Sequence, residues 1–377
     1  MRNLFFYGTM RDAALLEIVL GKSGEDLSAT PAMLENYAVS AVTEGPFPMI
    51  EVRTGASAEG VVIKGLDAQD IARLDFYEGG FNYDLHVVSL ADGQTAEVYV
   101  PQPGLWTPNG PWSFADWQAT SGELSRFAAV EVMGYYGTRS RADVAKIFPR
   151  IRVRAAARVN AQSSLHGAGV FRGKVEVTQR RIAYSHYYAL EELHLRHEKF
   201  SAEMSATMER AVFVGNDAAI LLPYDPVRDC VMLVEQIRMG PLVRGDATVW
   251  QLEPIAGGID PGETPEDAAR REAQEEAGLT LNALEKIAEV YASPGNATEF
   301  FYVFLGLADL PDTATGIGGL ASEHEDIRSH IIPFADFINM VDSFDATNAP
   351  LVMAANWLAR HRDRLRSAPP GATPEAS

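Results

Sequence analysis

The segment 257–279, GGIDPGETPEDAARREAQEEAGL, gathers the acidic side chains that are best spaced for chemistry. On a helix, Glu272 and Glu276 lie one turn apart with Glu275 beside them, so three carboxylates share one edge. Each pair of like charges costs roughly a few tenths of a kcal/mol. A hard divalent cation removes that cost, because Mg2+ binds through a few carboxylates and keeps positions open for water and phosphate. The spacing therefore predicts a metal and phosphate site rather than an acidic helix face exposed to water.

A helix must hold these carboxylates in place, and the flanking residues indicate where it begins and ends. Thr264 is a suitable N-cap, Pro265 fits the first turn, and Asp267 completes a pattern like a capping box. Gly278 can end the helix in a left-handed conformation. Small apolar residues would let the helix pack closely on a sheet: Ala268, Ala269, Ala273 and Ala277. We therefore predict a capped helix between Thr264 and Gly278.

The same segment fits a longer frame, G-x5-E-x7-R-E-U-x-E-E-x-G-U, in which U is apolar. The matching residues are Gly257, Glu263, Arg271, Glu272, Glu275, Glu276 and Gly278. In this frame the chain resembles the Nudix hydrolases, which cleave a nucleoside diphosphate linked to another group. The resemblance implies an α/β fold, an α/β/α sandwich around a mixed sheet. Apolar segments at strand and helix spacing agree with it, at 218–224, 230–237, 300–307, 329–334 and 351–365.

Three further segments resemble the ADP-ribose pyrophosphatases of this superfamily, so that the similarity covers roughly residues 175–365. They are VEQIR at 234–238, Ser293-Pro294-Gly295 with Glu299 beyond it, and GIGGLASEHEDIRSHII at 316–332. The resemblance implies hydrolysis of ADP-ribose to AMP and ribose 5-phosphate. Another nucleoside diphosphate sugar, such as GDP-mannose, is the alternative substrate. A non-hydrolytic ADP-ribose sensor is the alternative function, although the box is complete and no basic recognition helix is visible.

The resemblance also assigns metal ligands and a general base. It implies that the ligands are Glu272, Glu276, Glu325 and the backbone carbonyl of Ala256, around two or three Mg2+ ions or Mn2+ in their place. Glu323 takes the position of the carboxylate that activates the attacking water. If Glu323 is a spectator, a box glutamate, Glu275, would accept the proton instead.

Other residues are expected to contact the substrate or to support the site. By resemblance, Arg238 binds the diphosphate or the terminal ribose, and Glu299 binds a ribose hydroxyl. By the same resemblance, Pro294 and Gly295 form a turn that contributes to substrate binding. Arg271 is expected to be structural, pairing with the box carboxylates and holding the loop. In the family, strands ahead of the core are exchanged between two subunits and help to bind adenine; the strand-rich stretch 173–214 matches them, which predicts a homodimer.

The amino-terminal part carries a second resemblance. FFYGTM at 5–10 and LDFYEGGFNY at 74–83 resemble the γ-glutamylcyclotransferase-like (AIG2-like) fold, an α+β barrel. In that fold a loop matched here by Tyr7, Gly8, Thr9 and Met10 presents backbone N–H groups to a carboxylate. Glu78 matches the acid/base that takes a proton from the substrate's α-ammonium group before ring closure to 5-oxoproline. The module is interpreted as an active cyclotransferase, a regulatory module that binds a small carboxylated ligand, or a structural appendage.

Composition limits what the whole chain can do. With 377 residues, 47% of them hydrophobic and 22% charged, two globular domains are expected. The net charge of −19 argues against binding to nucleic acid or to anionic membranes. The single cysteine, Cys230, excludes an internal disulfide and fits a reducing cytoplasm. No segment approaches the ~20 apolar residues of a membrane span.

The domain boundaries follow from these segments. We expect a γ-glutamylcyclotransferase-like domain that ends within the Pro-rich stretch 101–112, a connecting helix and linker, a Nudix domain and a disordered tail. Their expected ranges are 1–110, 111–172, 173–366 and 367–377. The Arg-rich stretch 137–165 has an ambiguous period and receives no secondary-structure assignment.

Overall fold

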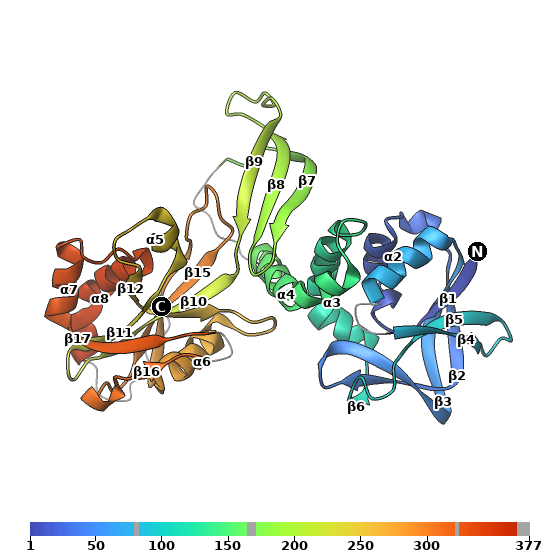
Figure 1. The fold of residues 1–377 in the computed structure, drawn as a ribbon, viewed down its shortest axis with the longest axis horizontal. Helices are drawn as coiled ribbons and strands as arrows, with labels where there is room; N and C mark the ends of the chain where they lie inside the picture. Colours follow the sequence, from blue (N-terminus) through green and yellow to red (C-terminus); the bar gives the residue numbers. More distant parts are fainter. Residues whose placement is uncertain (79–82, 164–170, 321–323, 368–377) are drawn as a thin grey trace. The chain divides into compact units, whose positions relative to one another are not determined.

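The chain separates into two compact units in the computed structural model, Met1–Ala211 and Val212–Ser377 (Figure 1). The structure describes residues 1–78, 83–163, 171–320 and 324–367. The two units therefore meet in the chain after Ala211, whereas the sequence suggested that the second domain begins at residue 173. Of the expected tail 367–377, only Ser367 lies within the described residues.

The first unit is built on a six-stranded mixed sheet with the strand order β4-β5-β1-β3-β2-β6. Its strands are β1 (Arg2–Phe6), β2 (Ala29–Val42), β3 (Gly45–Leu66), β4 (Tyr83–Ser89), β5 (Thr95–Pro101) and β6 (Pro108–Pro111). Strand β1 pairs in parallel with β5 and antiparallel with β3. The stretch 101–112 does not leave the module as expected, because β6 returns to pair with β2.

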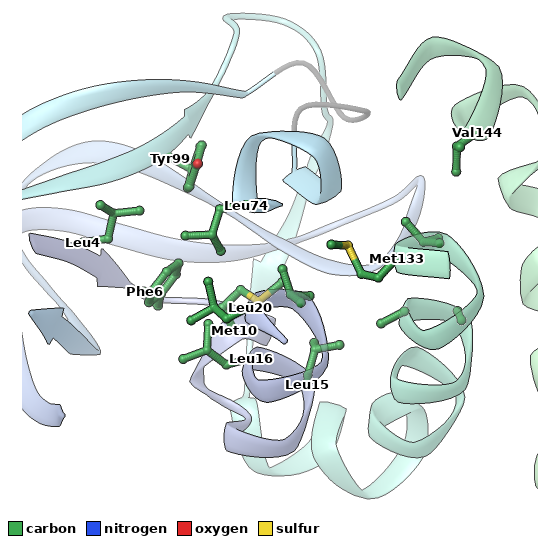
Figure 2. Packing of buried hydrophobic residues seen from close by; sticks show 14 of the residues in the cluster. Leu4, Phe6, Met10, Leu15, Leu16, Leu20, Leu74, Tyr99, Met133 and Val144 are labelled. Atoms are coloured by element: carbon green, nitrogen blue, oxygen red, sulfur yellow. The ribbon is translucent and has the colours of Figure 1, made fainter. Parts of the chain in front are cut away.

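Helices cover one face of this sheet. They are α1 (Ala13–Leu20), α2 (Ala68–Glu78), α3 (Phe114–Gly134) and α4 (Arg141–Ser163), with the 3-10 turns η1 (Thr9–Arg11) and η2 (Gly24–Asp26). Because side chains alternate along a strand, Leu4 and Phe6 of β1 pack among the helices, as Figure 2 shows. Phe5 and Tyr7 belong to a separate cluster on the opposite face. Both faces of β1 are therefore buried.

Helix α4 occupies the Arg-rich stretch that the sequence left unassigned. Arg154 of α4 is only 2% exposed and donates to Glu131 of α3 at 2.6 Å and to the Ser185 hydroxyl at 3.1 Å. Arg158 donates to Glu191 at 3.2 Å. Ser185 and Glu191 belong to a three-stranded sheet of β7 (Val175–Ser185), β8 (Ala189–His197) and β9 (Met208–Val214). The hydrogen bond to Ser185 and the ion pair with Glu191 attach the small sheet to the first unit, which explains why that unit extends beyond residue 173.

The second unit contains an eight-stranded mixed sheet with the order β14-β15-β10-β11-β17-β16, in which β12 pairs with β11 and β13 with β10. Its strands are β10 (Asp217–Asp225), β11 (Cys230–Ile237), β12 (Trp250–Glu253), β13 (Ile255–Gly258), β14 (Ala283–Tyr291), β15 (Phe300–Leu307), β16 (Ile317–Gly318) and β17 (Ile327–Pro333). Strand β10 is parallel to β15 and antiparallel to β11, so the sheet is mixed, as predicted.

Two helical layers enclose this sheet. The helices are α5 (Met239–Arg244), α6 (Pro265–Ala277), α7 (Phe334–Asp342) and α8 (Ala349–Ser367), with the 3-10 turn η4 (Asp312–Ala314). Leu221 and Phe304 share a core with α6, whereas their strand neighbours Leu222 and Leu305 share a core with α7 and α8. This alternation confirms the α/β/α sandwich. In the part of the chain that the structure describes, no helix has the length and hydropathy needed to cross a membrane.

Candidate functional site

Helix α6 presents the acidic residues, and its caps are those predicted. The Thr264 hydroxyl accepts a hydrogen bond from the Asp267 backbone N–H at 3.1 Å and donates to the Asp267 carboxylate at 2.7 Å. At the other end Gly278 has φ 63°, and its N–H donates to the Gln274 carbonyl at 3.0 Å. Because both ends are satisfied, the helix holds Glu272, Glu275 and Glu276 at fixed positions.

Arg271 connects the helix to the loop that precedes it. It donates to both carboxylate oxygens of Glu263 at 2.9 Å and to the Gly258 carbonyl at 2.9 Å. It also donates to Glu272 at 2.5 Å and to Glu275 at 3.0 Å. This confirms the structural role predicted for Arg271: one guanidinium offsets three carboxylates and fixes the loop against the helix.

A close approach of backbone to carboxylate explains the glycine at position 257. A Cβ atom there would lie 1.8 Å from Oε1 of Glu272. Glycine therefore leaves room for the Glu272 carboxylate against strand β13, and a larger residue would displace that side chain. The neighbouring Ala256, whose carbonyl is a predicted metal ligand, pairs with Ile220 in the same ladder, so its position is set by the sheet.

Glu276 is the most constrained acid of the site. Its side chain is 3% exposed, and its Oε2 atom has no hydrogen-bond partner among the described residues. Burial raises the pKa of Glu276 to about 8, and the nearby charges of Glu272 and Glu325 add to the shift. The charge of Arg238 acts in the opposite direction. A buried carboxylate with an unpartnered oxygen beside other carboxylates is unfavourable unless a cation joins it.

Glu325 reaches this cluster from a distant loop. Its carboxylate accepts a hydrogen bond from the Leu320 backbone N–H at 3.0 Å. Gly319 has φ +94°, and a Cβ there would lie 2.7 Å from the Cβ of Glu325. A Cβ on Gly318 would lie 2.1 Å from the Glu276 carbonyl oxygen. Two glycines therefore let the loop pack on α6 and bring Glu325 close enough to raise the pKa values of Glu272 and Glu276.

The donor set fits a divalent cation, although its side chains are not gathered around one point. Glu272, Glu276 and Glu325 repel one another, and one buried oxygen of Glu276 is unpartnered. Within the described residues, no three acidic, histidine or cysteine side chains already lie close enough to hold an ion. Glu272 is instead turned to Arg271. Glu323, the predicted general base, lies outside the described residues, and Glu275 is engaged by Arg271.

Arg238 is held beside the acidic cluster by a residue that the sequence did not reveal. Its Nε donates to Glu253 at 2.6 Å, and Glu253 is 5% exposed. Asn348 donates to the other oxygen of Glu253 at 3.0 Å. Burial raises the pKa of Glu253, while Arg238 opposes the shift. The strand pairing of Val234 with Glu253 brings this acid next to β11, so it positions Arg238.

The remaining predicted substrate residues lie in two environments. Burial raises the pKa of Glu299 and the charge of Arg238 opposes that shift, so these two side chains belong to one neighbourhood. Pro294 and Gly295 form an exposed turn, in which the Asn296 N–H donates to the Ser293 carbonyl at 3.1 Å. This turn is bonded to the end of β9, since the Phe213 N–H donates to the Asn296 carbonyl at 2.8 Å.

A second candidate site lies in the first unit, in a cavity around Glu78. The predicted loop residues Tyr7, Gly8, Thr9 and Met10 line it together with Glu78 itself. Burial raises the pKa of the Glu78 carboxyl to about 7. Burial raises the pKa values of four surrounding tyrosines, and the charge of Glu78 adds to each shift: Tyr7, Tyr77, Tyr83 and Tyr99. The structure thus places Glu78 and the predicted loop at one cavity.

The loop before this cavity has a close packing partner. A Cβ on Gly8 would lie 2.8 Å from Cγ of Pro48. Gly8 precedes the 3-10 turn η1, and its carbonyl accepts a hydrogen bond from the Arg11 N–H at 3.0 Å. Asp12 then caps α1 by accepting from the Leu15 N–H at 2.9 Å. The turn that presents the loop is therefore fixed on both sides.

Two protein-family models match the chain. The model described as "NUDIX domain" matches residues 216–354, and the model described as "Gamma-glutamyl cyclotransferase, AIG2-like" matches residues 4–119. The two matched segments contain the two sites, except that Ser125, Phe148 and Arg152, which also line the cavity around Glu78, lie beyond residue 119. The order of the two domains is the one predicted from the sequence.

Curated relatives match about half of the chain. An ADP-ribose pyrophosphatase of Escherichia coli (strain K12) is 40% identical over 193 residues, which are 51% of this chain and 91% of that protein. An ADP-ribose pyrophosphatase of Haemophilus influenzae is 32% identical over 51% of this chain and 89% of that protein. A GDP-mannose pyrophosphatase of Cronobacter sakazakii is 32% identical over 44% of this chain and 85% of that protein.

Proposed function

The chain belongs to the Nudix hydrolases, and on that basis we propose that it hydrolyses ADP-ribose to AMP and ribose 5-phosphate in the presence of Mg2+. The observation that carries the metal-dependent chemistry is Glu276, which is buried beside Glu272 and Glu325 with one oxygen unpartnered. The similarity to ADP-ribose pyrophosphatases over nine-tenths of their length supports the substrate.

Each residue of the site has a part in this proposal. Glu276, Glu272, Glu325 and the Ala256 carbonyl would hold the ion or ions. When bound, Mg2+ offsets the charge of a diphosphate and lowers the pKa of an attacking water. Arg271 keeps the loop and the helix in register, and Glu253 orients Arg238 toward the substrate's diphosphate or terminal ribose. Glu323 would accept the proton from water, with Glu275 as the alternative base.

Product analysis tests the substrate. Purified full-length chain with Mg2+ and ADP-ribose should release AMP and ribose 5-phosphate, separated by ion-exchange chromatography. Cleavage in H2(18)O should put the label on one product only, because water attacks a single phosphorus. If no AMP forms at a micromolar concentration of enzyme, ADP-ribose is not the substrate.

GDP-mannose is the second candidate, because a GDP-mannose pyrophosphatase is 32% identical to this chain. A direct comparison of kcat/KM for ADP-ribose and GDP-mannose under identical Mg2+ decides between them. A higher kcat/KM for ADP-ribose supports our proposal, and a higher value for GDP-mannose replaces it. The remaining alternative, a non-hydrolytic sensor, would bind ADP-ribose without releasing AMP or ribose 5-phosphate.

For the first unit we propose γ-glutamyl cyclotransferase activity. Glu78, with its pKa near 7 among tyrosine rings, is suited to accept a proton from an α-ammonium group at neutral pH. The freed amine then attacks the γ-carbonyl, the amide bond breaks, and the proton leaves with the released amine. Formation of 5-oxoproline from γ-glutamyl peptides, measured by mass spectrometry, tests this activity independently of ADP-ribose hydrolysis.

We further propose that the protein is a homodimer in which the strands β7, β8 and β9 take part. Their exposed apolar side chains support this, since Val175 is 61%, Val177 47% and Tyr184 58% exposed. Multi-angle light scattering should give twice the mass of 41.1 kDa. A monomer over the working concentration range would refute the dimer.

A further inference from the structure

The cavity around Glu78 is closed by residues that lie outside the family match. That match ends at residue 119, yet Ser125 of α3 and Phe148 and Arg152 of α4 line the same cavity. Helix α4 is fixed in this place by the buried pair of Arg154 and Glu131. The site thus contains side chains that the cyclotransferase-like domain by itself does not supply.

Arg152 differs from its neighbours on α4. Arg154 donates to Glu131, and Arg158 to Glu191. The Arg150 guanidinium lies 3.8 Å from the centre of the Tyr187 ring. Arg152 is half-buried, and among the described residues it has neither a hydrogen-bond nor an ion-pair partner; burial alone lowers its pKa.

The cavity therefore contains two charged groups that do not neutralise each other. Burial raises the pKa of Glu78 and lowers the pKa of Arg152, so in both cases it disfavours the charged form. If the two side chains formed an ion pair, each would favour the charged form of the other. Both side chains line the same cavity, and within the described residues no ion pair joins them or pairs either one with another charge.

The cavity is small and mostly aromatic. It measures about 100 Å³, which exceeds the roughly 10–15 Å³ that one water needs on the same measure. Phe6, Phe47, Tyr99 and Trp117 are among the lining residues. Apolar walls of this kind strengthen a charge–charge contact, because they replace the water that would screen it.

We propose that Arg152 is the anion anchor of this cavity, which takes a small zwitterionic molecule with its carboxylate against Arg152 and its amine end toward Glu78. A planar guanidinium matches a carboxylate through two parallel N–H donors. The assignment rests on the cavity of the proposed cyclotransferase but does not require turnover by Glu78. Arg152 would bind the end of the ligand that the loop of Tyr7, Gly8, Thr9 and Met10 does not contact.

Titration calorimetry on the full chain tests the anchor with two probes that contain no bond for a cyclotransferase to break. 5-Aminopentanoate has both charged ends, and pentylamine lacks only the carboxylate. Wild-type protein should bind 5-aminopentanoate about tenfold more tightly than pentylamine, as expected for one charge-assisted contact. Arg152→Gln should remove that difference, and Arg152→Lys should restore part of it.

A matched control separates the anchor from a general loss of charge. Lys146→Gln removes one positive charge from the exposed surface of the same helix and should leave the difference between the probes unchanged. Circular dichroism verifies that each variant is folded. The proposal is overturned if folded Arg152→Gln binds 5-aminopentanoate as tightly as wild type, or if wild-type protein binds neither probe. A lack of 5-oxoproline formation would remove the proposed activity and leave this binding result intact.

Discussion

Glu276 of the second unit, which is buried, and Glu78 of the first, which is half-buried, both have a raised pKa, about 8 and about 7 respectively. Their surroundings differ. Glu276 lies near Glu272 and Glu325, whereas burial alone accounts for the shift of Glu78, which faces four tyrosines. Similar titration behaviour therefore has two meanings. Repulsion between carboxylates favours a cation, while an acid isolated among rings is suited to exchange a proton near neutral pH.

The arginines of the two sites also differ in their surroundings. Arg271 contacts three carboxylates and a carbonyl, so its charge is used within the protein. Arg152 has no such partner in the described part of the chain and faces a cavity. An arginine saturated by its own protein supports a site, and one without a partner in a cavity is available to a ligand.

The largest expected effect tests the proposed metal site of the second unit. Glu276→Gln keeps the shape of the side chain but removes a predicted ligand, so kcat for ADP-ribose should fall about a thousandfold. Glu266→Gln, on the same helix and half-exposed, should stay within about twofold of wild type. Steady-state kinetics at saturating Mg2+ measure both. Full activity of Glu276→Gln would reject the metal site.

The next largest effect tests Glu78 of the first unit as a proton acceptor. Glu78→Gln should lower the rate of 5-oxoproline release about a hundredfold or more, because general base catalysis is lost. In wild type the rate should rise as the pH increases through about 7, since Glu78 must be ionised to accept a proton. ADP-ribose hydrolysis should not change in this variant. A rate that is independent of pH between 5.5 and 8.5 would contradict the role of Glu78.

A smaller effect tests the residue that orients Arg238. Glu253→Gln keeps a hydrogen-bond acceptor for Arg238 but removes the charge, and we expect KM for ADP-ribose to rise about tenfold with a smaller change in kcat. Asn348→Ala removes only the second contact of Glu253 and should have a weaker effect. An unchanged KM in Glu253→Gln would show that Arg238 needs no such support.

Local spacing predicted much of the second unit. The caps of α6 and the apolar spacing of helix α8 depend on residues a few positions apart, and both elements were found in the structure. Glu253 was missed because nothing in its own segment distinguishes it from an ordinary strand acid. Only the antiparallel pairing of β12 with β11 brings it to Arg238.

The first unit was predicted less completely, for a physical reason. Helix α4 has no clear apolar period because two of its inward-lying positions are charged. Arg154 is buried against Glu131, and Arg152 lines the cavity around Glu78. Strand β2 was missed because its alternation is interrupted at Asn36, which has φ 63° and coincides with a shift in the pairing register. Buried charges and bulges hide an element from pattern analysis, and here they lie close to the site they help to build.

The smallest expected effect is on thermal stability, and it distinguishes the surroundings of Glu276 from those of Glu78 without any substrate. If carboxylate repulsion marks a cation site, Mg2+ at about 100 times its Kd should add about 2.7 kcal/mol to the stability of the second unit. For a unit of this size that corresponds to a rise in Tm of roughly 5–10 °C. Differential scanning calorimetry should show the rise in wild type and in Glu78→Gln but not in Glu276→Gln. A rise that Glu276→Gln retains would mean that Mg2+ binds elsewhere, and the raised pKa of Glu276 would then reflect burial alone, as it does for Glu78.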